Sequence, residues 1–144
     1  MAQSKSRPDD LPRLTGLSVL ILEDNVDFSE AMQFMLTTCG AGTTAVASVA
    51  EARAAVQAHV PDLVITDLVL PDGTGVEFVD WLRELPPAKG GGVAVVAVTA
   101  FPRNFPAVTT RGFAAYYVKP LELADLCWTI ASILGRGPRP PARS

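Results

Sequence analysis

The sequence predicts an α/β fold in which a doubly wound, five-stranded parallel sheet is flanked by helices. Short apolar runs alternate along the chain with segments whose apolar residues have helical spacing. The runs are apolar along their whole length, which is typical of parallel strands covered on both faces. The chain has 144 residues, 49% of them hydrophobic, enough for one domain with a core of its own. The predicted strands are 18–22, 43–47, 62–66, 93–98 and 114–118.

Helical spacing also predicts the connections between these strands. An amphipathic stripe runs from Phe28 to Cys39 and ends at Gly40, and a second helix opens with the capping-box pattern Ser48-x-x-Glu51 and ends before residue 61. Further helices are predicted around residues 79–85 and 123–134. The fourth connection, 101–112, contains two prolines, which permit a short or irregular helix and exclude a long regular one.

The ends of the chain lack apolar periodicity, so we expect residues 1–16 and 135–144 to be mobile tails around one domain at 17–134. A formal net charge of -3 gives no reason to expect nucleic-acid binding, and the chain has no apolar run long enough to span a membrane. The N-terminus has no secretory h-region, so Cys39 and Cys127 are expected to be reduced core residues of a cytoplasmic protein.

Chemically active side chains follow four of the five predicted strands. Glu23 and Asp24 come after the first, Asp67 after the third, Thr99 after the fourth and Lys119 after the fifth. Ligands of such sheets bind at the carboxyl ends of the strands, although any one of these residues alone could be a solvated loop residue. Three carboxylates repel one another and favour a hard divalent cation such as Mg²⁺. Beside Lys119 and Thr99, Asp67 would then be a nucleophile that forms an acyl phosphate.

Four blocks of sequence, EDN (23–25), DLVLPDGTG (67–75), TA (99–100) and YYVKP (116–120), resemble the receiver domain of two-component response regulators. The resemblance covers roughly residues 17–134 and implies a flavodoxin-like fold. It also implies that Asp67 is the phosphoacceptor.

The same resemblance implies the Mg²⁺ ligands and the phosphoryl-binding groups. Asp24 would bind Mg²⁺ directly, Glu23 would act through water, and Asp67 and the backbone carbonyl of Val69 would complete the protein ligands. Thr99 would hydrogen-bond to the phosphoryl group. Lys119 would pair with it, held by a Lys-Pro peptide that is typically cis in this family.

The resemblance further implies a signalling role rather than an enzyme's. Phosphorylation would draw Thr99 inward and favour an inward Tyr116, the aromatic switch residue, although Tyr117 beside it leaves the choice open. The phosphoryl donor would be a histidine kinase or histidine phosphotransfer protein, and the output would pass to an unidentified protein partner, with phosphorylation-dependent dimerisation left open. Val69 and Phe101 are apolar at positions that tune hydrolysis, so dephosphorylation is expected to be slow.

Three alternatives remain on sequence grounds. The chain could be a phosphate-independent pseudo-receiver that only binds a partner, or the receiver segment of a larger regulator or hybrid histidine kinase. A small Mg²⁺-dependent phosphatase of the aspartyl-phosphate type would share the chemistry. Such enzymes have a motif of the form D-x-D-x-[TV] after their first strand, whereas here the candidate nucleophile follows the third strand.

Overall fold

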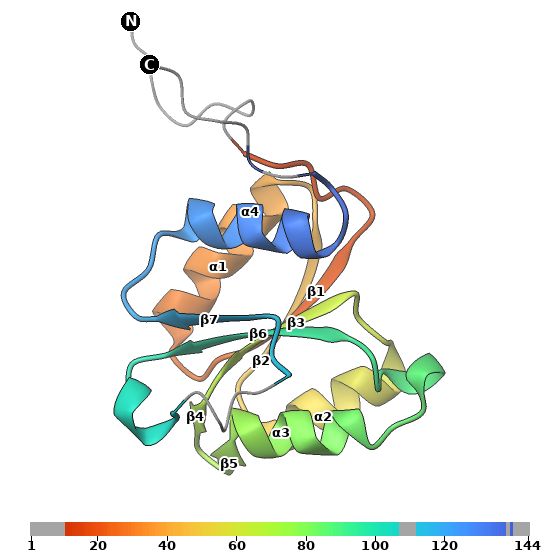
Figure 1. Cartoon of the computed structure of the whole chain (residues 1–144), viewed down its shortest axis with the longest axis vertical. Helices are drawn as coiled ribbons and strands as arrows, with labels where there is room; N and C mark the ends of the chain where they lie inside the picture. The colour runs from red at the N-terminus through yellow and green to blue at the C-terminus, as the bar shows by residue number, and fades with distance from the viewer. Residues whose placement is uncertain (1–10, 107–111, 138, 140–144) are drawn as a thin grey trace, which may run out of the picture.

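The computed structural model describes residues 11–106, 112–137 and 139, which form a five-stranded parallel sheet with helices on both faces (Figure 1). The strand order is β2-β1-β3-β6-β7, with every neighbouring pair parallel. The order reverses after β1, as in a doubly wound fold. The predicted fold class and strand order along the chain are confirmed. The sheet strands are β1 (Ser18–Leu22), β2 (Gly42–Val46), β3 (Leu63–Asp67), β6 (Ala94–Thr99) and β7 (Ala115–Val118).

Two layers of helices enclose this sheet, α1 and α4 on one face and α2 and α3 on the other (Figure 1). Alternate residues of the central strands pack against the two helix layers. Val19 and Ile21 of β1 belong to the core under α1 and α4, whereas Leu20 and Leu22 belong to the core under α2 and α3. The helices are α1 (Val26–Thr38), α2 (Val49–Ala58), α3 (Gly75–Arg83) and α4 (Leu123–Ile133).

Short polar side chains start three of these helices. Asn25 and Ser48 accept hydrogen bonds from the backbone amides of Phe28 and Glu51, at the starts of α1 and α2. Thr74 and Glu77 form a reciprocal capping box at the start of α3. These bonds satisfy amides that have no partner within the helix, and so fix where each loop above the sheet joins its helix.

The packed structure begins before residue 17, the domain boundary predicted from the sequence. Leu14 is completely buried and Leu11 is nearly so, both within the core under α1 and α4. The amide of Leu14 donates to the carbonyl of Cys39, and beyond α4 a guanidinium nitrogen of Arg136 donates to the carbonyl of Thr15. The two ends of the domain therefore support each other. Residues 1–10, 138 and 140–144 of the expected tails lie outside the described residues.

The segment after β6 contains a three-residue 3-10 helix, Pro102–Asn104. This fits the prediction of a short or irregular helix, because the ring of Pro102 starts the turn and Pro106 follows it. Residues 107–111 of the same prediction lie outside the described residues. The small antiparallel pair β4 (Val69–Leu70) and β5 (Gly73–Thr74) was not predicted.

Both cysteines are free thiols buried in the core under α1 and α4, as predicted. Across the ranges that the structure describes, every helix is too short or too polar to cross a membrane.

Candidate functional site

The site lies at the carboxyl edge of the sheet, where the predicted residues emerge side by side. Asp67 ends β3 and pairs in register with Val98, so Thr99 ends β6 one residue beyond it. The amide of Lys119 donates to the carbonyl of Thr99, at 2.8 Å, which places the lysine at the same edge. Parallel pairing therefore assembles residues that are as much as 96 positions apart.

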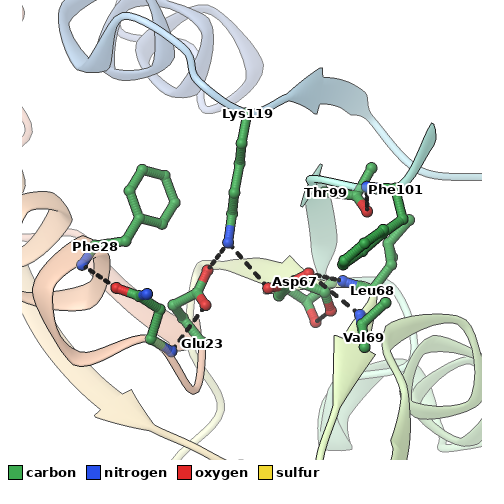
Figure 2. A network of polar contacts seen from close by, with 10 residues as sticks. Glu23, Phe28, Asp67, Leu68, Val69, Thr99, Phe101 and Lys119 are labelled. Atoms are coloured by element: carbon green, nitrogen blue, oxygen red, sulfur yellow. Dashed lines mark hydrogen bonds and ion pairs between the residues drawn. The ribbon is translucent and has the colours of Figure 1, made fainter.

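Lys119 joins two of the acidic residues. Its Nζ lies 2.8 Å from Oε1 of Glu23 and 3.0 Å from Oδ2 of Asp67 (Figure 2). Both carboxylates are buried, with Glu23 3% and Asp67 6% exposed. Buried carboxylates are stable only when they are paired and hydrogen-bonded, and the ammonium supplies both interactions here.

Backbone groups orient the carboxylate of Asp67. Its Oδ1 accepts hydrogen bonds from the amides of Leu68 at 2.6 Å and Val69 at 3.2 Å, so Oδ2 faces Lys119 (Figure 2). The hydroxyl of Thr66 donates to the carbonyl of Asp67, and α3 starts at Gly75 directly against this carbonyl. Asp67 is thus held at both its backbone and its side chain.

Burial and pairing act in opposite directions on the charges of this site. Burial raises the pKa of Glu23 above its usual 4.5, and the hydrogen bonds from Lys119 and from the amide of Asn25 limit the rise. Burial alone would lower the pKa of Lys119, but its hydrogen bonds to Glu23 and Asp67 outweigh this effect and raise the pKa above 10.5. The lysine therefore remains a cation throughout the neutral pH range.

Glu23, Asp24 and Asp67 could together hold a metal ion. Each offers a carboxylate oxygen, and these oxygens lie within 4.8 Å of one another. Asp24 is exposed, and a cavity of about 240 Å³ opens beside it and Glu23, between the start of α1 and the end of β2. An accessible set of oxygen donors without nitrogen or sulfur suits Mg²⁺ better than Zn²⁺.

The remaining predicted residues lie beside this cluster. Thr99 is completely buried, and its hydroxyl accepts a hydrogen bond from the amide of Phe101 at 3.0 Å. Figure 2 places both on the opposite side of Asp67 from Glu23. Tyr116 is half-buried, with its hydroxyl donating to the carbonyl of Phe105 at 3.2 Å.

Tyr117 points to the other face of the sheet, as period-two alternation predicts. Its ring packs on the core under α1 and α4, and its hydroxyl is 2.5 Å from that of Thr129 in α4. The two tyrosines therefore differ in their surroundings, and Tyr116 is the one connected to the loop after Thr99.

Sequence reasoning missed two contacts at this edge. The carboxylate of Asp72 accepts hydrogen bonds from the amides of Val49 and Ala50, so it caps α2 from the loop after Asp67. These bonds lower the pKa of Asp72 below its usual 3.8. The ring of Phe28 lies under the ammonium of Lys119. The spacing of Phe28 marked it as a core residue of a helix, and no local pattern links it to the lysine that follows β7.

Comparison with known proteins agrees with this geometry. The model of the response regulator receiver domain matches residues 19–131. The chain belongs to this family. It is 32% identical to the polar-differentiation response regulator DivK of Brucella abortus, over 82% of this chain and 96% of DivK.

Solved receiver domains have the same fold. A CheY-like receiver domain from Methylobacillus flagellatus superposes with a TM-score of 0.73 at 32% identity, covering 81% of this chain and 98% of that one. Another, from Methanospirillum hungatei, superposes with a TM-score of 0.76 at 25% identity, covering 83% and 94%. The receiver fold is therefore shared, and its acidic cluster lies where a phosphoacceptor site is expected.

Proposed function

We propose that this receiver domain accepts a phosphoryl group on Asp67 in a Mg²⁺-dependent reaction and passes the signal to a protein partner. The observation that carries the proposal is the convergence of Glu23, Asp24 and Asp67, whose oxygens lie within 4.8 Å, with the ammonium of Lys119 3.0 Å from Asp67. Such a site has a nucleophile, a place for a cation and a fixed positive charge.

Glu23, Asp24, Asp67 and the backbone carbonyl of Val69 would hold the Mg²⁺. When bound, the ion would offset charge on the phosphoryl oxygens and draw them to the site. Asp24 is exposed, and among the contacts of the described residues its carboxylate has no partner that the ion would have to displace. Both features support a role as the direct ligand. The buried Glu23 carries a hydrogen bond on each oxygen, which fits contact through water.

In the transfer step, a carboxylate oxygen of Asp67 would form a bond to phosphorus while the bond from phosphorus to the donor nitrogen breaks. The electron pair of that bond would return to the histidine of a kinase or phosphotransfer protein. Lys119 would pair with the new phosphoryl oxygens, and the hydroxyl of Thr99 would donate to them. Both residues border Asp67 in the structure (Figure 2).

A conformational response would follow from two hydrogen bonds to the loop after β6. Thr99 holds the amide of Phe101, and Tyr116 holds the carbonyl of Phe105, at opposite ends of the turn that contains the 3-10 helix. If Thr99 moves toward a phosphoryl group, the turn must shift and Tyr116 must lose or change its partner. The surface near β6, β7 and α4 would then present the signal to a protein partner or to a second copy of the domain.

The acyl phosphate would hydrolyse slowly. The side chains of Val69 and Phe101 flank Asp67, and they are 40% and 53% exposed. Neither has a hydrogen-bonding group that could orient an attacking water. A phosphoryl lifetime of seconds, measured by loss of the mass adduct, would contradict this expectation.

The test of the proposed function is intact mass after incubation with acetyl phosphate and Mg²⁺. The wild type should gain one phosphoryl adduct that disappears when Mg²⁺ is chelated and is absent in Asp67→Asn. Asp80→Asn is the matched control, because Asp80 is an exposed aspartate of α3 outside the acidic cluster, and it should be phosphorylated normally. A folded wild type without an adduct would favour the pseudo-receiver, in which the same surfaces bind a partner without phosphate.

A further inference from the structure

The ammonium of Lys119 has a third neighbour besides its two carboxylates. Its Nζ lies over the ring of Phe28, 4.7 Å from the ring centroid. This is within the roughly 6 Å over which the negative face of an aromatic ring attracts a cation. Figure 2 shows the phenyl ring beside the lysine stem, on the side away from Asp67.

The start of α1 fixes the position of this ring. The amide of Phe28 donates to Oδ1 of Asn25 at 2.8 Å, and the amide of Asn25 donates to Oε2 of Glu23 at 3.0 Å (Figure 2). The ring also packs against the core under α1 and α4. One short segment therefore presents both a carboxylate and an aromatic face to the same ammonium.

We propose that Phe28 is a positioning residue for Lys119, holding its ammonium where it bridges Glu23 and Asp67. A lysine side chain has a flexible four-carbon stem and many rotamers, so its charge is placed only if its surroundings restrict it. Two carboxylates restrict the ammonium from one side. The ring restricts it from another side without accepting a conventional hydrogen bond, which leaves an N–H for an arriving phosphoryl oxygen.

The effect on phosphorylation rests on the proposed function, whereas the contact between ring and ammonium does not. If Lys119 must turn from Oδ2 of Asp67 to a phosphoryl oxygen, the ring keeps the cation close during the exchange. Truncating the ring should slow phosphorylation by acetyl phosphate about fivefold, the effect expected of one partly shielded cation–π contact.

The decisive experiment replaces Phe28 with phenylalanines carrying one, two and three ring fluorines. Fluorine withdraws charge from the ring face while hardly changing its size, so the phosphorylation rate should fall stepwise with each fluorine. Phe28→Leu should show the whole of the roughly fivefold decrease in rate, and Phe28→Tyr should retain most of the rate. The same changes at Phe34, which is 73% exposed on the same helix, should have no effect.

A second measurement tests the contact without any phosphoryl chemistry. The ring should shift the proton resonances of the Lys119 methylene next to Nζ, and Phe28→Leu should abolish the shift while Phe34→Leu preserves it. A rate that is indifferent to fluorination would overturn the proposal, as would an unshifted methylene. If the wild type takes no phosphoryl group, the proposed function has failed, and the methylene shift alone decides whether Phe28 positions the ammonium.

Discussion

Gly75 is the residue at which packing and chemistry are most directly joined, and we expect Gly75→Ala to damage both. A Cβ added here would lie 2.9 Å from Cδ2 of Leu68, 2.9 Å from Oγ1 of Thr66 and closer still to the carbonyl oxygen of Asp67. Ordinary contacts begin at 3.4 Å. Leu68 could rotate, but the carbonyl of Asp67 belongs to a central strand and cannot move alone.

The magnitude follows from what must give way. Gly75 is the first residue of α3, and its amide is bonded to the carbonyl of Leu68, so the start of the helix and the end of β3 must separate. Overpacking by one methyl group in a tight site typically costs about 1–3 kcal/mol, and contact with backbone places this site in the upper half of that range. Under the proposed function, the displaced Asp67 would also bind Mg²⁺ and the phosphoryl group less well.

Urea unfolding followed by tryptophan fluorescence would measure the change in stability, and adduct formation with acetyl phosphate would measure the change in the site. Gly92→Ala is the matched control, because a Cβ there meets nothing within 4 Å. It should be neutral or slightly stabilising, by up to about 1 kcal/mol. Equal stability and equal phosphorylation of the two variants would refute the argument that close approach to Asp67 requires glycine at position 75.

Three further predictions concern the start of the packed domain, the cap of α2 and the lysine of the site. Leu14→Ala should lower the free energy of unfolding by about 2–5 kcal/mol, because the side chain is completely buried, and a loss below about 1 kcal/mol would contradict its place in the core. Asp72→Ala should lower the thermal midpoint at pH 7, where the ionised carboxylate caps α2. Because the folded pKa lies below 3.8, that stabilisation is present above pH 3.8 and disappears as the pH falls through the folded pKa, so the two midpoints should converge in acid. Lys119→Met should raise the pKa of Glu23 further above 4.5. A carboxyl group with a raised pKa stabilises the fold below pH 4.5, where it is protonated, and this stabilisation is lost as the pH rises through the folded pKa. The free energy of unfolding of Lys119→Met, measured in urea, should therefore fall further below that of the wild type from pH 5 to pH 8, by as much as about 3 kcal/mol. A difference independent of pH would count against a buried, unpaired Glu23.

Sequence patterns predicted the sheet and the edge at which the candidate site residues meet, because both depend on local signals. Apolar runs mark buried strands, and because the strands are parallel, the residue after each run lies at the same edge of the sheet. Asp67 and Lys119 could thus be placed together from strand order alone, although 52 residues separate them. The prolines of 101–112 similarly excluded a long helix, because a missing amide is a local property.

Contacts between elements without a repeating pattern were not accessible in this way. Leu14 lies in a segment that has few apolar residues, so its complete burial in the core under α1 and α4 depends on contacts that only the assembled fold creates. Asp72 looked like a turn residue, but its carboxylate reaches the amides of a different helix. The approach of Phe28 to Lys119 depends on the angle at which α1 leaves the sheet, which apolar spacing does not specify.

Under the proposed function, the hydrogen bonds of Lys119 also indicate which side of the domain should respond to phosphorylation. A phosphoryl group on Asp67 adds negative charge and acceptor oxygens, so Lys119 should exchange its bond to Oδ2 for one to the new group. On one side, Glu23 is anchored through Asn25 to the first turn of α1, and that side is already fixed. On the other, the backbone of Lys119 is bonded to the carbonyl of Thr99, whose hydroxyl holds the next loop. Because the anchored side resists movement, we expect the shift to pass through Thr99 toward β6 and β7, and α1 to remain nearly unchanged.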